Sequence, residues 1–261
     1  MRYTLAEDAK PQVTLLIAAS AVSVGLWIVS LFVPIAAYLV YPLQLFATFV
    51  HEGGHALAAL ITGNSVSSLT VSPDTSGMVW SQASGFSGLL ISSAGYLGTT
   101  AFGTLLLVWM RYSLSSRLGL YFSAGFVGIM TFGFGFIAPF WNLLSNVTFG
   151  SVAFTIVSGA VLTVALAAIA KFASLKWVNF ALAFLSVQCL LNALFSLKSL
   201  FVISASTDAT SDAANMAAAT GIPALIWVFL WIGISLIMIT AGIRLYATSK
   251  TAVSADSVFE D

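Results

Sequence analysis

The stretch LQLFATFVHEGGHALAALI at residues 43–61 places His51, Glu52 and His55 inside an apolar helix. The 261-residue chain has no other histidine. Positions i and i+4 of a helix share a face, so both imidazoles can bind one zinc ion while the glutamate acts as general base. The spacing therefore predicts a zinc hydrolase, and two histidines packed on a buried helix are the alternative.

The composition around this motif is that of a membrane protein. The chain is 59% hydrophobic and 7% charged with a mean hydropathy of +1.02, whereas soluble domains carry roughly 25% charged residues. A formal net charge of zero without a basic cluster argues against a nucleic-acid partner. The single cysteine, Cys189, excludes an intramolecular disulfide and a Cys-rich zinc site.

Apolar stretches long enough to cross about 30 Å of hydrocarbon predict seven membrane spans. They lie at 13–34, 36–62, 88–110, 118–139, 149–170, 177–204 and 222–247. Six spans are the alternative, because only the region around Pro34 and Pro42 separates the first two. We expect an all-α polytopic membrane protein that forms one domain over residues 1–261 and retains its first span.

The connections between these spans fall into two kinds. Three contain no Lys or Arg, namely 63–87, 140–148 and 205–221, and the others are basic: Arg111 and Arg117, Lys171 and Lys176, Arg244 and Lys250. With seven spans, the positive-inside rule places the basic connections in the cytoplasm and the N-terminus outside, although Arg2 and Lys10 oppose this. In either orientation, the loops after the second, fourth and sixth spans share a side.

The zinc motif is expected inside the bilayer, because His55 precedes the end of its span by about seven residues, or roughly 10 Å. A metal-binding group at that depth is costly unless it faces a protein-lined cavity, which favours a functional role. Small residues around the motif would let neighbouring helices approach, as ordinary membrane helix packing also requires: Gly53, Gly54, Ala56, Ala58 and Ala59.

A short β-hairpin is predicted at 66–82, directly after the zinc-motif helix. Residues 67–71 and 78–82 have the pattern of strands, and SPDTSG at 72–77 is typical of a turn. Beside the site, the hairpin could hold an extended substrate by strand addition, or serve as a lid or connector.

A catalytic zinc site usually takes three protein ligands, so a third must be found. The candidates on the zinc side are Asp74, Asp208 and Asp212. Asp74 suits the hairpin turn. Asp212 lies in the segment 205–221, near the start of a predicted short helix that ends at Gly221, and is either a ligand or a helix cap. We favour Asp212 as the ligand because parity places this segment on the zinc side.

The motif HEGGHAL at 51–57, the hairpin and AGYLG at 94–98 together resemble the site-2 protease family of intramembrane zinc metallopeptidases. The compact branch without a PDZ domain, found in bacteria and plants, is the most similar, and SDA at 211–213 with TGIP at 220–223 and Trp227 fits it as well. The resemblance covers roughly residues 45–231. It implies a zinc metalloendopeptidase of a bacterial plasma or inner membrane, with membrane proteins or membrane peptides as substrates.

For individual residues, the resemblance implies His51 and His55 as zinc ligands, Glu52 as catalytic base and an aspartate from a later span as third ligand. Better-known members supply that aspartate from Asn-x-x-Pro followed by Asp-Gly. Here FWNLLS at 140–145 keeps Asn142 without the proline or the aspartate, so the assignment moves to Asp212. Asn142 is expected to bind substrate backbone or an oxyanion, with helix capping as the alternative.

Two other classes of function fit parts of the pattern. A membrane scaffold or pseudoprotease would keep the motif without cleaving anything. A metal carrier would place acidic or histidine pairs at several depths, or repeat its halves around broken helices, and the sequence has neither feature.

Overall fold

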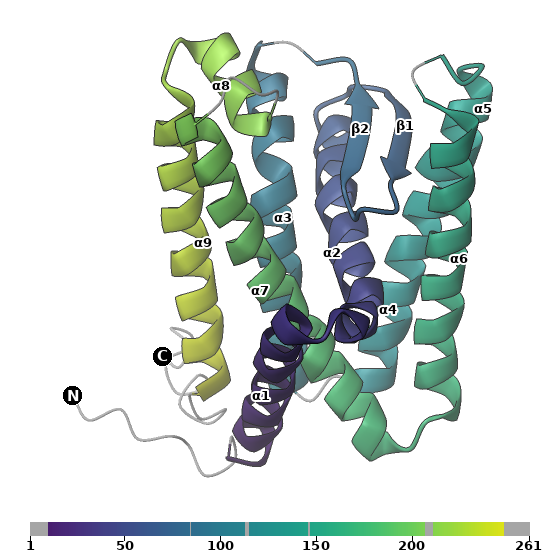
Figure 1. Ribbon diagram of the computed structural model, residues 1–261, viewed down its shortest axis with the longest axis vertical. Coiled ribbons are helices and arrows are strands. Elements are labelled where there is room, and N and C mark those ends of the chain that lie inside the picture. The colour runs from purple at the N-terminus through teal and green to yellow at the C-terminus, as the bar shows by residue number, and fades with distance from the viewer. Residues whose placement is uncertain (1–9, 84, 113–114, 146, 207–210, 248–261) are drawn as a thin grey trace, which may run out of the picture.

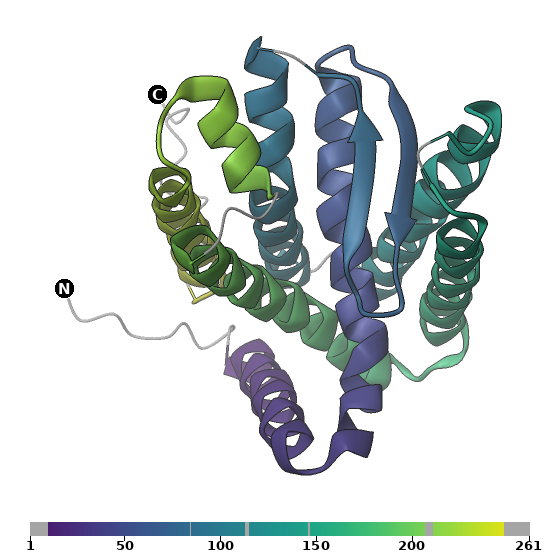
Figure 2. The ribbon, with the colours of Figure 1, turned by 45° about the horizontal axis from the view of Figure 1, so that its top comes forward.

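The computed structural model describes residues 10–83, 85–112, 115–145, 147–206 and 211–247. It is a helical bundle with one hairpin and a π-helical segment, η2 (Figures 1 and 2). The elements are α1 (Lys10–Phe32), α2 (Pro34–Ile61), β1 (Val66–Val71), β2 (Gly77–Ser81), α3 (Gly85–Arg111), α4 (Ser116–Ile129), η2 (Met130–Ile137), α5 (Ala138–Trp141), α6 (Phe149–Phe172), α7 (Leu175–Ser206), α8 (Asp212–Thr220) and α9 (Ala224–Ala247).

The all-α membrane fold with one hairpin is confirmed. Six helical stretches in the described ranges are long and apolar enough to cross a membrane, close to the predicted seven. They are α1, α3, the continuous run from α4 through η2 to α5, α6, α7 and α9. Two helices lie outside this group: α8, which has nine residues, and α2, which carries the zinc motif. Its residues Phe46, Ala47 and Phe49 are buried by protein.

The first two helices meet at a sharp junction. Val33 is extended and Pro34 opens α2, where its fixed φ suits a helix start and its missing N–H leaves no partner unsatisfied. In Figure 1, α1 begins at the lower end and joins α2 about midway up, and α2 continues to the upper end. The pair therefore crosses the height of the bundle once.

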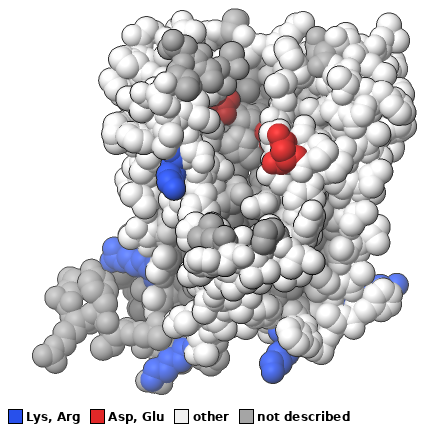
Figure 3. All heavy atoms as spheres, viewed as in Figure 1, with Lys and Arg blue, Asp and Glu red and all other residues white. Residues whose placement is uncertain are grey.

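This junction places the start of α1 on the side of the basic connections, whereas the sequence predicted the opposite side. The start of α1 lies at the lower end of Figure 1, together with the ends of α3, α6 and α9. Most Lys and Arg side chains visible in Figure 3 also lie there. Lys10 thus falls at the same end as the three basic connections, which removes the conflict with the positive-inside rule.

The three connections without Lys or Arg gather at the opposite end, as parity requires. The turn after α5 and the helix α8 lie at the top of Figure 1, and the hairpin extends from that end with its turn about midway down the bundle. The strands β1 and β2 are antiparallel, with Val71 opposite Gly77. The outer edge of β1 is held by α6, because Val71 N donates to Thr155 Oγ1 at 2.8 Å.

The helix α3 packs against α2, α7 and α9 and organises the bundle. At Gly54 of α2, an added Cβ would lie 2.4 Å from the carbonyl oxygen of Ala94, so only glycine permits this approach of α2 to α3. Ser186 Oγ donates to Gly103 O at 2.8 Å, which ties α7 to α3 inside an apolar core. The expected small-residue packing is confirmed at Gly54.

Cysteine accessibility tests this arrangement. Cysteines introduced at the exposed residues Ser76 and Ser145 should react with a membrane-impermeant maleimide from one side, and those at Ser115 and Ser174 from the other. The native Cys189 is fully buried and should stay unlabelled, which supplies the background control. Labelling of Ser76→Cys and Ser145→Cys from opposite sides would contradict the fold.

Candidate metal centre

Two imidazoles on one face of α2 form the base of the site. The Nε2 atoms of His51 and His55 are 3.2 Å apart. His55 Nδ1 donates to the carbonyl oxygen of Ile91 in α3 at 2.6 Å. A carbonyl only accepts, so the proton lies on Nδ1 and the lone pair of Nε2 is left for a metal ion.

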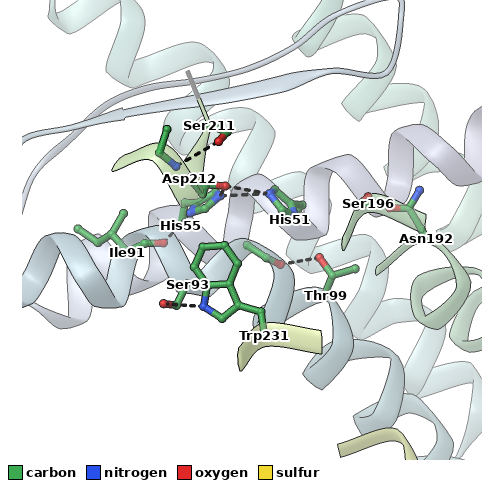
Figure 4. A network of polar contacts seen from close by, with 12 residues as sticks. His51, His55, Ile91, Ser93, Thr99, Asn192, Ser196, Ser211, Asp212 and Trp231 are labelled. Carbon is green, nitrogen blue, oxygen red and sulfur yellow. Dashed lines mark hydrogen bonds and ion pairs between the residues drawn. The ribbon is translucent and has the colours of Figure 1, made fainter. Parts of the chain in front are cut away.

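The carboxylate of Asp212 completes the group from the opposite side (Figure 4). Its Oδ2 lies 3.4 Å from His55 Nε2 and 3.8 Å from His51 Nε2. The alternative role of Asp212 as a helix cap is taken by its neighbour, since Ser211 Oγ accepts from Ala214 N at 3.2 Å. Asp212 is the first residue of α8, and its side chain faces the histidines.

Charge and burial act in opposite directions on Asp212. Burial by itself raises the pKa of this carboxyl, because a low dielectric disfavours the charged form. The charge of His55 in its protonated form and the contacts of both imidazoles with the carboxylate outweigh burial and hold the pKa below its usual range, and a metal ion would take the place of the Nε2 proton. The carboxylate is therefore ionised, which is the form that binds a metal ion.

The donor set fits a tetrahedral divalent ion. The ligand atoms of His51, His55 and Asp212 all lie within 4.8 Å of one another. Ligands bound to zinc at about 2.0–2.1 Å would be separated by about 3.3 Å, close to the spacing observed here. Two imidazoles and a carboxylate with one position left open are typical of catalytic zinc.

A glycine of α3 makes room for the two rings. A Cβ added at Gly95 would lie 2.4 Å from the Nε2 atoms of both His51 and His55. Sequence reasoning quoted Gly95 as part of a resemblance and missed this contact. The available signal was a glycine inside a helix, where it costs about 1 kcal/mol relative to alanine and so calls for a packing reason.

Glu52 lies beneath the hairpin. Its side chain is 5% exposed and packs against the first residue of β2, where a Cβ added at Gly77 would lie 2.5 Å from Glu52 Oε1. Glu52, which lies between the two histidines along α2, is therefore covered by the start of β2.

The other predicted residues lie elsewhere. Asp74 is exposed at the hairpin turn, where hydrogen bonds from the side chain and backbone of Ser76 hold its pKa below its usual range. Asp208 falls outside the described residues. Asn142 Nδ2 donates to Ala138 O at 2.8 Å and to Ser67 O at 3.2 Å, so its amide joins the end of α5 to β1. Its role in substrate binding stays a prediction.

Comparison with known proteins places this geometry in a family. The family model described as Peptidase M50B-like matches residues 16–242, which include the motif at 51–55 and Asp212. Searches of the curated proteins and of the solved structures gave no match. With the match extending over most of the chain and six apolar helices in the fold, the protein belongs to the Peptidase M50B-like family of membrane metallopeptidases, which are of the site-2 protease type.

Proposed function

We propose that the protein is a zinc metalloendopeptidase that hydrolyses peptide bonds of membrane-embedded proteins or peptides. The observation that supports this best is the meeting of His51 and His55 of α2 with Asp212 of α8, with Glu52 beside the first histidine. A buried group of this kind in a membrane helix is costly without a function. A bacterial plasma or inner membrane is the location that we propose.

The reaction assigns a separate task to each residue. His51, His55 and Asp212 would hold the zinc ion, which when bound polarises a carbonyl and lowers the pKa of a water towards neutrality. Glu52 accepts a proton from the attacking water and passes it to the leaving nitrogen. The water oxygen bonds to the carbonyl carbon, the C–N bond breaks, and the products are a carboxylate and an amine.

The hairpin suits the presentation of substrate. A helical substrate hides its amides in internal hydrogen bonds and must unwind before cleavage. Thr155 of α6 occupies the edge of β1, whereas β2 forms the other edge of the two-stranded sheet and begins at Gly77 over Glu52. We propose that an unwound segment adds alongside β2. Figure 3 shows an acidic side chain inside the groove beside the hairpin.

Metal analysis tests the ligand set. Purified wild type should carry about one zinc per chain, and His51→Ala, His55→Ala and Asp212→Asn should each lose most of it. Asn at 212 leaves the Ser211 cap intact, so α8 should persist. Asp74→Asn is the matched control. Asp74 is held in the hairpin turn by Ser76, so this variant should keep its zinc. Equal zinc in all five proteins would refute the metal centre.

Replacement of the base separates catalysis from metal binding. Glu52→Gln should keep the zinc and lower cleavage of a reconstituted membrane peptide by about 10²-fold or more. Zinc-loaded wild type that cleaves no better than Glu52→Gln would favour the pseudoprotease. Zinc uptake into proteoliposomes by both proteins would favour the metal carrier.

Two glycines of α3 provide a steric test. Gly95→Ala should empty the site, because the added methyl group would overlap both imidazoles. Gly88→Ala should leave the zinc content unchanged, since no atom lies within 4 Å of the added Cβ. Both changes raise helix propensity by a similar amount, so only the contact differs. Full zinc occupancy in Gly95→Ala would show that the rings do not sit over this glycine.

A further inference from the structure

The two histidines of the site are held in different ways. His55 is oriented by the hydrogen bond from its Nδ1 to Ile91 O. Within the described part of the chain, the polar contacts of the His51 ring are with His55 Nε2 at 3.2 Å and Asp212 Oδ2 at 3.8 Å, and both partners belong to the site itself. Among the aromatic rings of the described residues, that of Tyr96 contacts the His51 ring from outside the metal group, edge to face at 4.6 Å and 85°.

Tyr96 is itself held by an anchored aromatic stack. Its ring stacks on that of Trp231 in α9, with centroids 5.2 Å apart and planes 18° apart. Trp231 Nε1 donates to Ser93 Oγ at 3.1 Å, and Ser93 Oγ donates to Leu89 O at 2.9 Å (Figure 4). The stack thus starts and ends on α3, and the hydrogen bond to Ser93 anchors the Trp231 ring.

The same rings pack against the helix that supplies the aspartate. Tyr96 and Trp231 share an apolar cluster with Ala213 and Met216 of α8, which are almost fully buried. Ala213 directly follows Asp212. One cluster therefore touches the His51 ring and supports the backbone that carries the carboxylate.

We propose that Tyr96 and Trp231 are positioning residues that orient the His51 ring for metal binding through ring contact rather than through the phenol hydroxyl. This inference rests on the proposed metal centre. A ring without an orienting hydrogen bond can turn its Nε2 away from the ion, and the edge-to-face contact prevents that rotation. Groups that orient metal ligands typically change metal affinity 10- to 100-fold.

Variants of Tyr96 test whether the ring or the hydroxyl acts. The full chain is stripped of metal and titrated with Co²⁺, whose visible absorption reports affinity and ligand geometry. Tyr96→Leu should weaken Co²⁺ binding about tenfold or more and change the spectrum. Tyr96→Phe, which keeps the ring, should restore both to wild-type values. Wild-type binding by Tyr96→Leu, or an equal loss in Tyr96→Phe, would overturn the proposal.

Two tryptophans one turn apart in α9 give a matched pair. Trp231→Leu removes the stack on Tyr96 and should weaken Co²⁺ binding. Trp227 donates from Nε1 to Thr220 Oγ1 at 3.3 Å and packs at the margin of the same cluster. Trp227→Leu should bind Co²⁺ like wild type. An equal loss in both variants would assign the effect to general packing and refute the stack.

Nuclear magnetic resonance of the metal-free protein supplies a readout that does not need the ion. The chain has only two histidines, so ¹⁵N-histidine labelling yields two imidazoles. Tyr96→Leu should shift or broaden the His51 signals, whereas the His55 signals, which also report correct folding, should keep the Nδ1–H form. Unchanged His51 signals would overturn the positioning role. Absence of Co²⁺ binding by wild type would refute the metal centre instead, and these spectra would still decide the orientation of His51.

Discussion

The meeting of Asp212 with His51 and His55 is the constraint on which the rest of the structure depends. A carboxylate in apolar surroundings is unfavourable unless positive charge compensates it, and two imidazoles together with a divalent ion would provide that compensation. The contact requires α8 to reach the same end of the bundle as the C-terminal half of α2. This condition is met when the chain crosses the bundle an even number of times between α2 and α8. It crosses four times: along α3, along the run from α4 to α5, along α6 and along α7.

The helix α3 supplies no metal ligand, yet it sets the geometry of the site. Its carbonyl at Ile91 orients one imidazole, and the missing side chain at Gly95 leaves space for both. The approach at Gly54 brings α2 close enough for these contacts to form. A backbone carbonyl and the absence of a methyl group are contributions that a list of polar side chains would overlook. These close contacts explain why glycine lies at position 54 of α2 and at position 95 of α3.

Part of this structure could be predicted because it depends on local pattern. The spacing of His51 and His55 follows from helical periodicity, and the turn around Asp74 follows from its sequence. The nomination of Asp212 came from counting crossings, and its side chain does lie beside the histidines. The remainder depends on tertiary contacts. Apolar length could not show that α1 meets α2 midway, and the pattern left Asp212 as either a ligand or a helix cap, whereas the cap is Ser211. Asn142 is a further residue whose contacts the sequence could not show, because its side-chain amide donates to backbone carbonyls of two separate elements.

The order of the metal group along the chain has a consequence for how the protein is made. His51 and His55 lie on α2, whereas Asp212 begins α8, so two imidazoles from early in the chain meet a carboxylate from late in it. This contact can form only after α3, the run from α4 to α5, α6 and α7 have been synthesised. A chain that stops short of α8 therefore lacks one of the three side chains that could hold the metal ion.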